Sequence, residues 1–168
     1  DEGLSSLSNA DLVFEAVPET DVAKKEAFQK LDSVLPHEAI VASTTSTFLA
    51  DLVAGWSKRS DYVLNAHFLN PAFLVPLVEV SPHEGIKSSA TNDLKQLLEE
   101  IGKMPVLCKA SPGYIVPRIQ ALAMTEAARL VEEGVATAED VEKAVCYGFG
   151  LRFAALSLLE FIDWGGLD

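Results

Sequence analysis

The sequence predicts an α/β fold with a parallel sheet, followed by an all-α region. Short apolar runs alternate with amphipathic helical patterns in the first part of the chain, which is the order expected of parallel βαβ units. Beyond residue 110 no strand pattern returns, and long helical patterns follow. We therefore predict one domain over residues 1–110 and the start of a second domain over residues 111–168.

The predicted strands are short runs with few charged residues. The first run contains two charged residues, Asp11 near its start and Glu15, and Pro18 ends it. Continuous apolar character of this kind fits strands that are buried on both faces of a sheet. The runs cover residues 10–17, 38–43, 62–68, 75–80 and 104–108.

The first domain also contains three predicted helices. Asp21 is placed to cap the first of them. A short helix is predicted over residues 48–56, and a third lies within residues 91–101 and stops at Gly102. The apolar face of the first helix consists of Phe28, Leu31 and Leu35, and that of the third consists of Leu94, Leu97, Leu98 and Ile101.

The second domain begins with a long helical pattern over residues 115–133, which Gly134 ends. The next helix begins with a capping box, in which Thr137 is followed three residues later by Asp140. We expect this helix to end at Gly148. The G-x-G that starts there follows a helix and not a strand, so we interpret it as a helix stop and not as a nucleotide loop.

Composition limits the possible partners. The chain has 168 residues, of which 49% are apolar and 23% charged, as in an ordinary globular protein. Its formal net charge of −12 disfavours a nucleic-acid partner, because such binding needs a basic surface. No apolar run is long enough to span a membrane, so we expect no membrane partner. Cys108 and Cys146 fit no metal spacing, so we expect no metal site and a reducing, cytoplasmic location.

Polar side chains follow the first three predicted strands. Glu19 and Lys24 follow the first strand, residues 44–47 follow the second, and the segment from His67 to Asn70 lies at the end of the third. The carboxyl ends of parallel strands meet at one edge of a sheet, where ligands bind. The sequence therefore predicts a binding site at this edge, although the Ser/Thr run also fits a simple helix-capping loop.

His67 and Glu79 lie twelve residues apart and are symmetric about Phe73, so a reversal near residues 71–73 would make them face each other. Imidazole exchanges a proton near neutral pH, and a carboxylate on its other nitrogen would fix the tautomer. A hydroxyl such as Ser46 could hold a substrate oxygen. This group suits hydride transfer between an alcohol and a ketone. A structural histidine, with Glu79 paired to a surface lysine, is the alternative interpretation.

The chain resembles the L-3-hydroxyacyl-CoA dehydrogenase family over nearly its whole length. The resemblance is carried by the stretches ADLVFEAVPE, STTST, AHFLNPAFLVPLVEV, IGKMPVLCKASPGYIV and EAARLVEEGVATAEDVEKAVCYGFG. It implies a partial Rossmann-type NAD-binding domain, without its first βαβ unit, for residues 1–110. It also implies that residues 111–168 begin a helical domain for dimerisation and substrate binding. The missing unit would carry the G-x-G-x-x-G turn, which the chain lacks.

The resemblance implies an enzyme of fatty acid metabolism and β-oxidation that interconverts L-3-hydroxyacyl-CoA and 3-oxoacyl-CoA with NAD and acts as a homodimer. It makes His67 the general acid/base, Glu79 its carboxylate partner and Ser46 a contact of the substrate 3-oxygen. Arg152 is expected to contact the substrate as well. The positions implied to face the cofactor are Glu19, Lys24, Thr44 and Asn70.

The chain departs from the family pattern at three positions. Thr44 and Pro117 each replace an asparagine, and Pro76 stands where acyl-CoA members often carry lysine. Pro76 and the stretch GFGLRFA resemble the branch of carnitine and gulonate dehydrogenases, which oxidise free 3-hydroxy acids. Arg152 would then meet a substrate carboxylate and not a CoA phosphate, unless it is only a surface cation. A non-catalytic, crystallin-like structural protein is the third interpretation.

Overall fold

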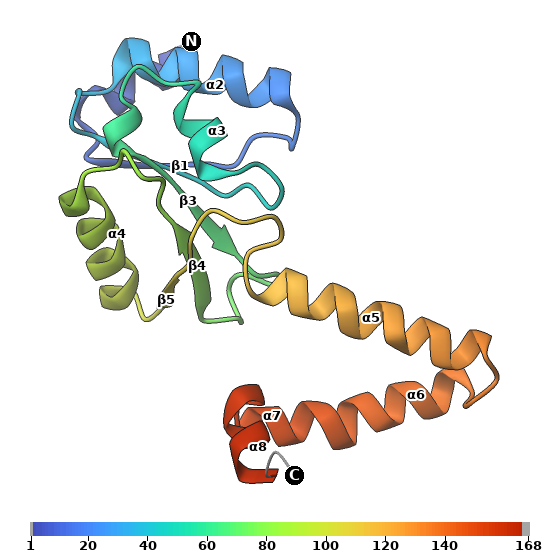
Figure 1. The fold of residues 1–168 in the computed structure, drawn as a ribbon. Coiled ribbons are helices and arrows are strands. Elements are labelled where there is room, and N and C mark those ends of the chain that lie inside the picture. Colours follow the sequence, from blue (N-terminus) through green and yellow to red (C-terminus); the bar gives the residue numbers. More distant parts are fainter. Residues whose placement is uncertain (1, 166–168) are drawn as a thin grey trace. The chain divides into compact units, whose positions relative to one another are not determined.

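The computed structural model describes residues 2–165, which form two compact units that divide between Arg118 and Ile119. The first unit contains a five-stranded sheet with helices, and the second unit contains helices alone among its described residues (Figure 1). The predicted fold class, a partial Rossmann-type α/β sheet followed by an all-α region, is confirmed.

The strands lie in the order β1-β2-β3-β4-β5 across the sheet. β3 and β4 are antiparallel, as the chain reversal expected near residues 71–73 requires, whereas the other neighbours are parallel. The connection between them is too short for a parallel crossover, which needs about a dozen residues or more. The bounds are β1 Leu12–Glu15, β2 Ile40–Ser43, β3 Val63–Phe68, β4 Leu77–Ser81 and β5 Met104–Leu107.

The helices of the first unit connect and cover these strands. Their bounds are α1 Glu2–Ser5, η1 Ser6–Asn9, α2 Asp21–Val34, α3 Ala50–Ala54, η2 Ser60–Tyr62 and α4 Ser88–Glu100. Helix α5, Val116–Glu132, begins in the first unit and continues in the second. The remaining elements are α6 Ala138–Ala144, the π-helical segment η3 Val145–Gly150, α7 Leu151–Ala155 and α8 Leu158–Gly165.

The helix ends depend on backbone conformation. Gly102 and Gly134 have φ angles of 79° and 72° and end α4 and α5 as predicted. Gly148 does not adopt this left-handed conformation, and the chain continues through it as a helix, so the predicted stop there is wrong. Thr20, and not Asp21, caps α2, because its hydroxyl accepts a hydrogen bond from a backbone amide in the first turn.

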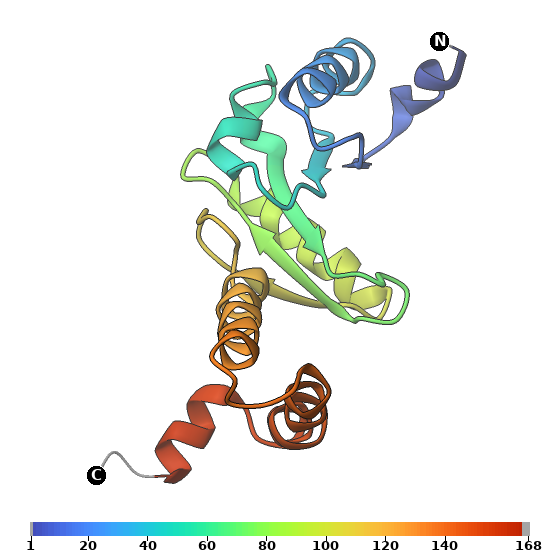
Figure 2. The ribbon, with the colours of Figure 1, turned by 90° about the vertical axis from the view of Figure 1, so that its right-hand side faces the viewer.

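Two apolar cores lie on opposite faces of the sheet, one under α4 and the other under α2 and α3 (Figure 2). Alternate residues of a strand point to opposite faces, so β2 and β3 supply both cores, whereas β4 supplies the core under α4. In α4, Leu94 and Leu98 are buried, but Leu97 and Ile101 are 36% and 59% exposed, so the predicted stripe is wider than the buried face. The strand residues under α4 are Ile40, Ala42, Leu64, Ala66, Val78 and Val80.

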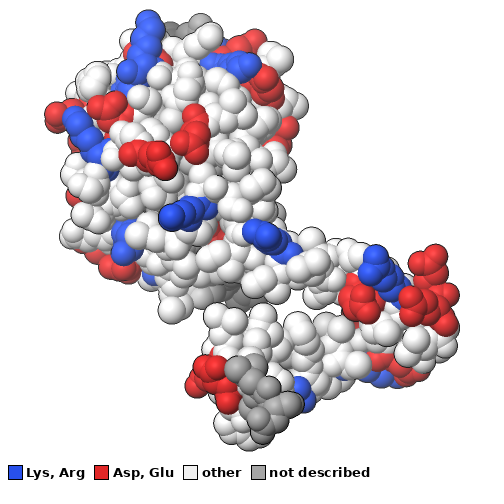
Figure 3. Space-filling view, in the orientation of Figure 1, with Lys and Arg blue, Asp and Glu red and all other residues white. Residues whose placement is uncertain are grey.

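The second unit exposes many apolar side chains. Several of them are at least 62% exposed, namely Leu122, Met124, Val135, Tyr147, Leu151, Leu159 and Trp164. Acidic side chains gather near the turn between α5 and α6 (Figure 3). In residues 2–165, no single helix has the length and apolar character to cross a membrane; the strongly bent pair 138–155 and 158–165 meets that test on length and composition.

Candidate active site

His67 and Glu79 face each other across the antiparallel pair β3–β4. The His67 Nδ1 atom lies 2.8 Å from Glu79 Oε2, and the two residues are 5% and 0% exposed. The predicted chain reversal is therefore confirmed. Because Glu79 is fully buried against His67, the alternative in which it pairs with a surface lysine is wrong.

Ser46 brings a hydroxyl to the opposite side of the imidazole. It lies in the loop after β2, and its Oγ is 3.2 Å from His67 Nε2. Ser46 is exposed, whereas Glu79 is buried, so the row Glu79–His67–Ser46 leads from the interior to the surface. The Ser46 end of this row is therefore the end that faces solvent.

The second carboxylate oxygen of Glu79 accepts two backbone hydrogen bonds at the start of α5. The Ile115 and Val116 amides donate to Oε1 over 2.9 and 2.7 Å. Together with His67, these groups place three N–H donors around one carboxylate. Because the Glu79 carboxylate only accepts hydrogen bonds, the ring proton of His67 lies on Nδ1. The Nε2 atom therefore carries the lone pair that faces Ser46.

Tyr114 covers one face of the imidazole, which the sequence analysis did not predict. The two rings are stacked with centroids 4.7 Å apart and an angle of 6° between their planes. The phenol donates to Thr45 O over 2.7 Å and accepts from Asn65 Nδ2 over 3.1 Å. Burial raises the pKa of Tyr114 well above its ordinary value, although the bond from Asn65 acts in the opposite direction, so the phenol is neutral.

Glu19 organises the loop that carries Ser46. Its Oε1 accepts from the Ser46 and Thr47 amides, each over 3.0 Å, and from the hydroxyls of Thr45 and Thr47. Burial by itself raises the pKa of Glu19, but the bonds from the 45–47 loop and from Lys24 outweigh it and lower the pKa to about 2. Glu19 is therefore a fixed anion beside Ser46.

Lys24 lies beneath this loop and is only 1% exposed. Its Nζ lies 3.1 Å from Glu15 Oε1 and 3.0 Å from Glu19 Oε2, and Glu15 also accepts from Ser43 Oγ. The ammonium group is thus paired with two carboxylates in the interior. This geometry favours a role in holding Glu19 over direct contact with a ligand.

The other predicted positions are less closely joined to this group. Thr44 is half-buried, and its amide donates to Glu15 O over 2.8 Å. Asn70 is exposed in the segment that follows β3. Arg152 belongs to α7 in the second unit, where its guanidinium lies 4.8 Å from the ring centre of Phe161.

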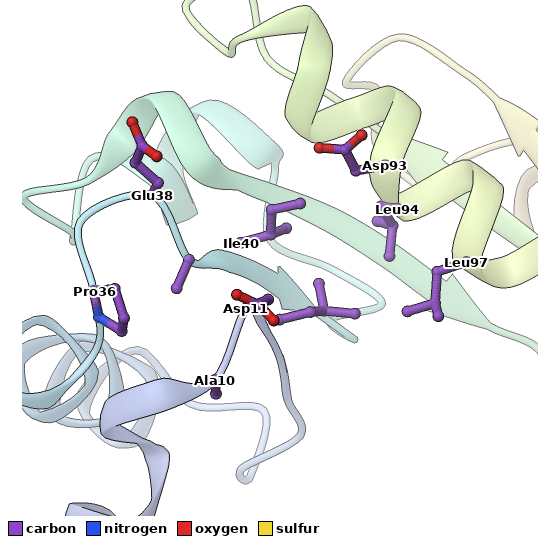
Figure 4. Close-up of a pocket in the computed structure, with 10 residues that line it drawn as sticks. Ala10, Asp11, Pro36, Glu38, Ile40, Asp93, Leu94 and Leu97 are labelled. Atoms are coloured by element: carbon purple, nitrogen blue, oxygen red, sulfur yellow. The ribbon is translucent and has the colours of Figure 1, made fainter.

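A separate hollow of about 440 Å³ lies at the amino ends of β1 and β2 (Figure 4). Its lining combines the carboxylates of Asp11, Glu38 and Asp93 with apolar side chains. It is distinct from the His67 group, which lies towards the carboxyl end of β3. No cluster of His, Cys, Asp and Glu in residues 2–165 has the arrangement of a metal site.

Comparison with known proteins gives consistent matches over both units. The family model for the NAD binding domain of 3-hydroxyacyl-CoA dehydrogenase matches residues 1–111, and that for the C-terminal domain matches residues 113–168. Hydroxyacyl-coenzyme A dehydrogenase, mitochondrial, of Sus scrofa is 35% identical over 99% of this chain and 52% of that protein. L-carnitine dehydrogenase of Bacillus cereus is 34% identical over 90% of this chain and 47% of that protein.

A solved structure shares the arrangement of the chain. The crystal structure of 5-formyl-3-hydroxy-2-methylpyridine 4-carboxylic acid 5-dehydrogenase, described as an NAD+-dependent dismutase, matches with a TM-score of 0.94 and 30% identity. The match covers 100% of this chain and 55% of that one. The chain therefore spans about half the length of the relatives that it matches.

Proposed function

Because the chain belongs to the 3-hydroxyacyl-CoA dehydrogenase family, we propose that its protein is an NAD-dependent oxidoreductase that interconverts L-3-hydroxyacyl-CoA and 3-oxoacyl-CoA. The observation that carries the proposal is the hydrogen-bonded row Glu79–His67–Ser46, which is buried at one end and open at the other. Such a row can move one proton at a defined substrate oxygen.

In this proposal His67 Nε2 accepts the proton of the substrate 3-hydroxyl. The Ser46 hydroxyl donates a hydrogen bond to the same oxygen and so fixes its place beside the imidazole. Glu79 accepts the hydrogen bond from Nδ1 and stabilises the positive charge that His67 gains. In the reverse direction the imidazolium returns its proton to the ketone oxygen.

The chain offers suitable groups for NAD at the edge where β1, β2 and β3 end. NAD, when bound, supplies the nicotinamide that exchanges the hydride. Glu19 is an anion whose side chain is still 36% exposed, so it has room to accept a bond from a ribose hydroxyl. We propose that Glu19, Thr44 and Asn70 contact the cofactor and that Lys24 holds Glu19 in place.

A dehydrogenase of a free 3-hydroxy acid is the second candidate. It is supported by the likeness to L-carnitine dehydrogenase and by Pro76, which stands where acyl-CoA members often carry lysine. In this case Arg152 would meet the substrate carboxylate, since guanidinium pairs well with carboxylates. For either substrate we propose a homodimer, because the helices of the second unit expose many apolar side chains.

The test uses the full-length protein, since the relatives extend beyond the matched region. NADH consumption is followed with acetoacetyl-CoA, and NADH production is followed in parallel with carnitine, gulonate and free 3-hydroxybutyrate. His67→Gln is the control variant, and its circular dichroism must match that of the parent protein. Light scattering on the same samples reports whether the protein is a dimer.

Turnover of the CoA ester that His67→Gln abolishes would support the first proposal. Turnover of a free hydroxy acid alone would replace it with the second and make Arg152 the next residue to substitute. Failure of a correctly folded protein on every substrate, with no binding of NADH, would reject both and favour the structural, crystallin-like interpretation.

A further inference from the structure

The turn before α5 encloses the His67–Glu79 pair from two sides. Tyr114 stacks on the imidazole, and the next two amides, those of Ile115 and Val116, donate to Glu79 Oε1. We propose that Tyr114 is a positioning residue, which holds the plane of the His67 ring for proton transfer. The proposal builds on the proposed dehydrogenase reaction and assigns a task within it to a residue that makes no hydrogen bond to His67.

The two rings are in close, flat contact. An angle of 6° and a centroid distance of 4.7 Å place the phenol flat against the imidazole. His67 has hydrogen-bond partners only in the plane of its ring, at Nδ1 and Nε2. A flat neighbour opposes tilting out of that plane, which those two bonds restrain weakly. An aromatic face also favours the positive charge that His67 gains in the reaction.

The phenol of Tyr114 is itself held in place. Tyr114 is 6% exposed, and its hydroxyl donates to Thr45 O and accepts from Asn65 Nδ2. Asn65 is fully buried on β3 and donates in addition to Phe48 O over 2.8 Å. The ring is thus tied to β3, which carries His67, and to the loop that carries Ser46.

The backbone conformation of the turn at Tyr114 also matters for the position of its ring. Tyr114 has a φ of 45° and follows Gly113, whose φ is 76°. A left-handed conformation is unfavourable for a residue with a side chain, and it persists where the surrounding contacts impose it. This turn aims the Tyr114 ring at His67 and the next two amides at Glu79. The same strained segment therefore sets the position of both members of the pair.

The test compares variants of the full-length protein. Tyr114→Leu and Tyr114→Met remove the ring, and methionine fills space flexibly if leucine does not fold. Both should lower kcat by about 10- to 100-fold with a change in KM below about threefold, because orientation matters more in the transition state than in binding. Tyr114→Phe keeps the stack but loses the anchoring bonds, so its kcat should lie above that of Tyr114→Leu and about three- to fivefold below that of the parent.

Tyr62→Leu is the matched control. Tyr62 is a buried tyrosine of the same unit that also contacts a histidine ring, that of His37, but it precedes β3 at the opposite end of that strand. Tyr62→Leu should lower the free energy of unfolding without lowering kcat. Equal losses of kcat in Tyr62→Leu and Tyr114→Leu would show that Tyr114 acts only through stability, and this would overturn the proposal.

A second readout does not depend on turnover. Protons above an aromatic ring resonate upfield, so the carbon-bound protons of the His67 ring should shift downfield in Tyr114→Leu and stay near their original positions in Tyr114→Phe. The His67 signals are assigned by their loss in His67→Gln. Unchanged His67 shifts in Tyr114→Leu or Tyr114→Met would overturn the positioning role. Inactivity of the parent on every substrate would instead reject the proposed function, while the shifts would still report on the stack.

Discussion

His67 on β3 and Glu79 on β4 are directly paired residues of one antiparallel ladder, with Nδ1 and Oε2 2.8 Å apart. The backbone register of two neighbouring strands therefore sets the distance between the imidazole and the carboxylate. The amides of Ile115 and Val116 occupy the remaining carboxylate oxygen.

Glu79→Gln should lower kcat by about 100- to 10,000-fold, because an amide cannot accept from His67 Nδ1 and from two backbone amides at once. The NH2 group of the substituted side chain would face one of these donors, although it is itself an N–H donor. Steady-state kinetics of the full-length protein with the substrate found active checks this expectation. Glu84→Gln, at an exposed position, is the control, and a loss below fivefold in Glu79→Gln would contradict the assigned role.

Glu19→Gln should make the free energy of unfolding depend less on pH in the acidic range. The pKa of Glu19 is about 2 in the folded protein against an ordinary 4.5, so its contribution is complete above about pH 4.5 and is lost as the pH falls towards 2. Because the side chain is 36% exposed, screening limits the contribution to below about 1 kcal/mol.

Urea unfolding of the parent protein and of Glu19→Gln at pH 6, 4 and 3 measures this effect. The difference in free energy of unfolding between the two should shrink as the pH falls. Glu26→Gln, at an exposed position of α2, provides the comparison. A difference that grows towards low pH would mean that the sign of the Glu19 shift is wrong.

Leu98→Ala should destabilise the protein by about 2–5 kcal/mol, because it leaves a cavity between α4 and the sheet. Leu98 is 0% exposed and belongs to the core of that face. Leu97→Ala, one residue away and 36% exposed, should have a clearly smaller effect. Chemical denaturation measures both, and equal losses would show that the two positions pack alike.

Arg59→Lys should lower the free energy of unfolding by about 1–3 kcal/mol. The Arg59 guanidinium is buried at the end of α2, where it bonds Asp32 Oδ1 over 3.1 Å and several backbone carbonyls, that of Leu35 among them. A lysine ammonium cannot reach all these acceptors. Lys58→Ala, at the exposed neighbouring position, is the control, and thermal or urea unfolding is the measurement.

The order of strands and helices could be predicted from the sequence because each depends on local patterns. The antiparallel direction of β4 could be predicted only from the symmetry of His67 and Glu79 about Phe73, because the direction of a strand depends on tertiary structure. Glycine identity likewise gave the stops at Gly102 and Gly134 but failed at Gly148. A glycine ends a helix only where the backbone turns left-handed.

The supporting residues of the site were harder to foresee. Lys24 was expected to face the cofactor, yet it is buried between Glu15 and Glu19, and no local pattern reveals that these carboxylates meet beneath the loop. Tyr114 stands in a Pro-Gly-Tyr sequence that is typical of a turn. Its stacking on His67 depends on a left-handed φ and on contacts with residues far away in the chain.

The short reversal between β3 and β4 has a consequence for how the protein can diversify. His67 and Glu79 lie on two strands that are neighbours both in sequence and in the sheet, so one continuous segment, residues 67–79, supplies both the imidazole and the carboxylate. Loops and helices that do not contact the pair can then change without moving the imidazole relative to the carboxylate, whereas the turn at residues 114–116 cannot. The relatives, at 30% to 35% identity, are named for molecules as different as hydroxyacyl-CoA, carnitine and a pyridine carboxylate.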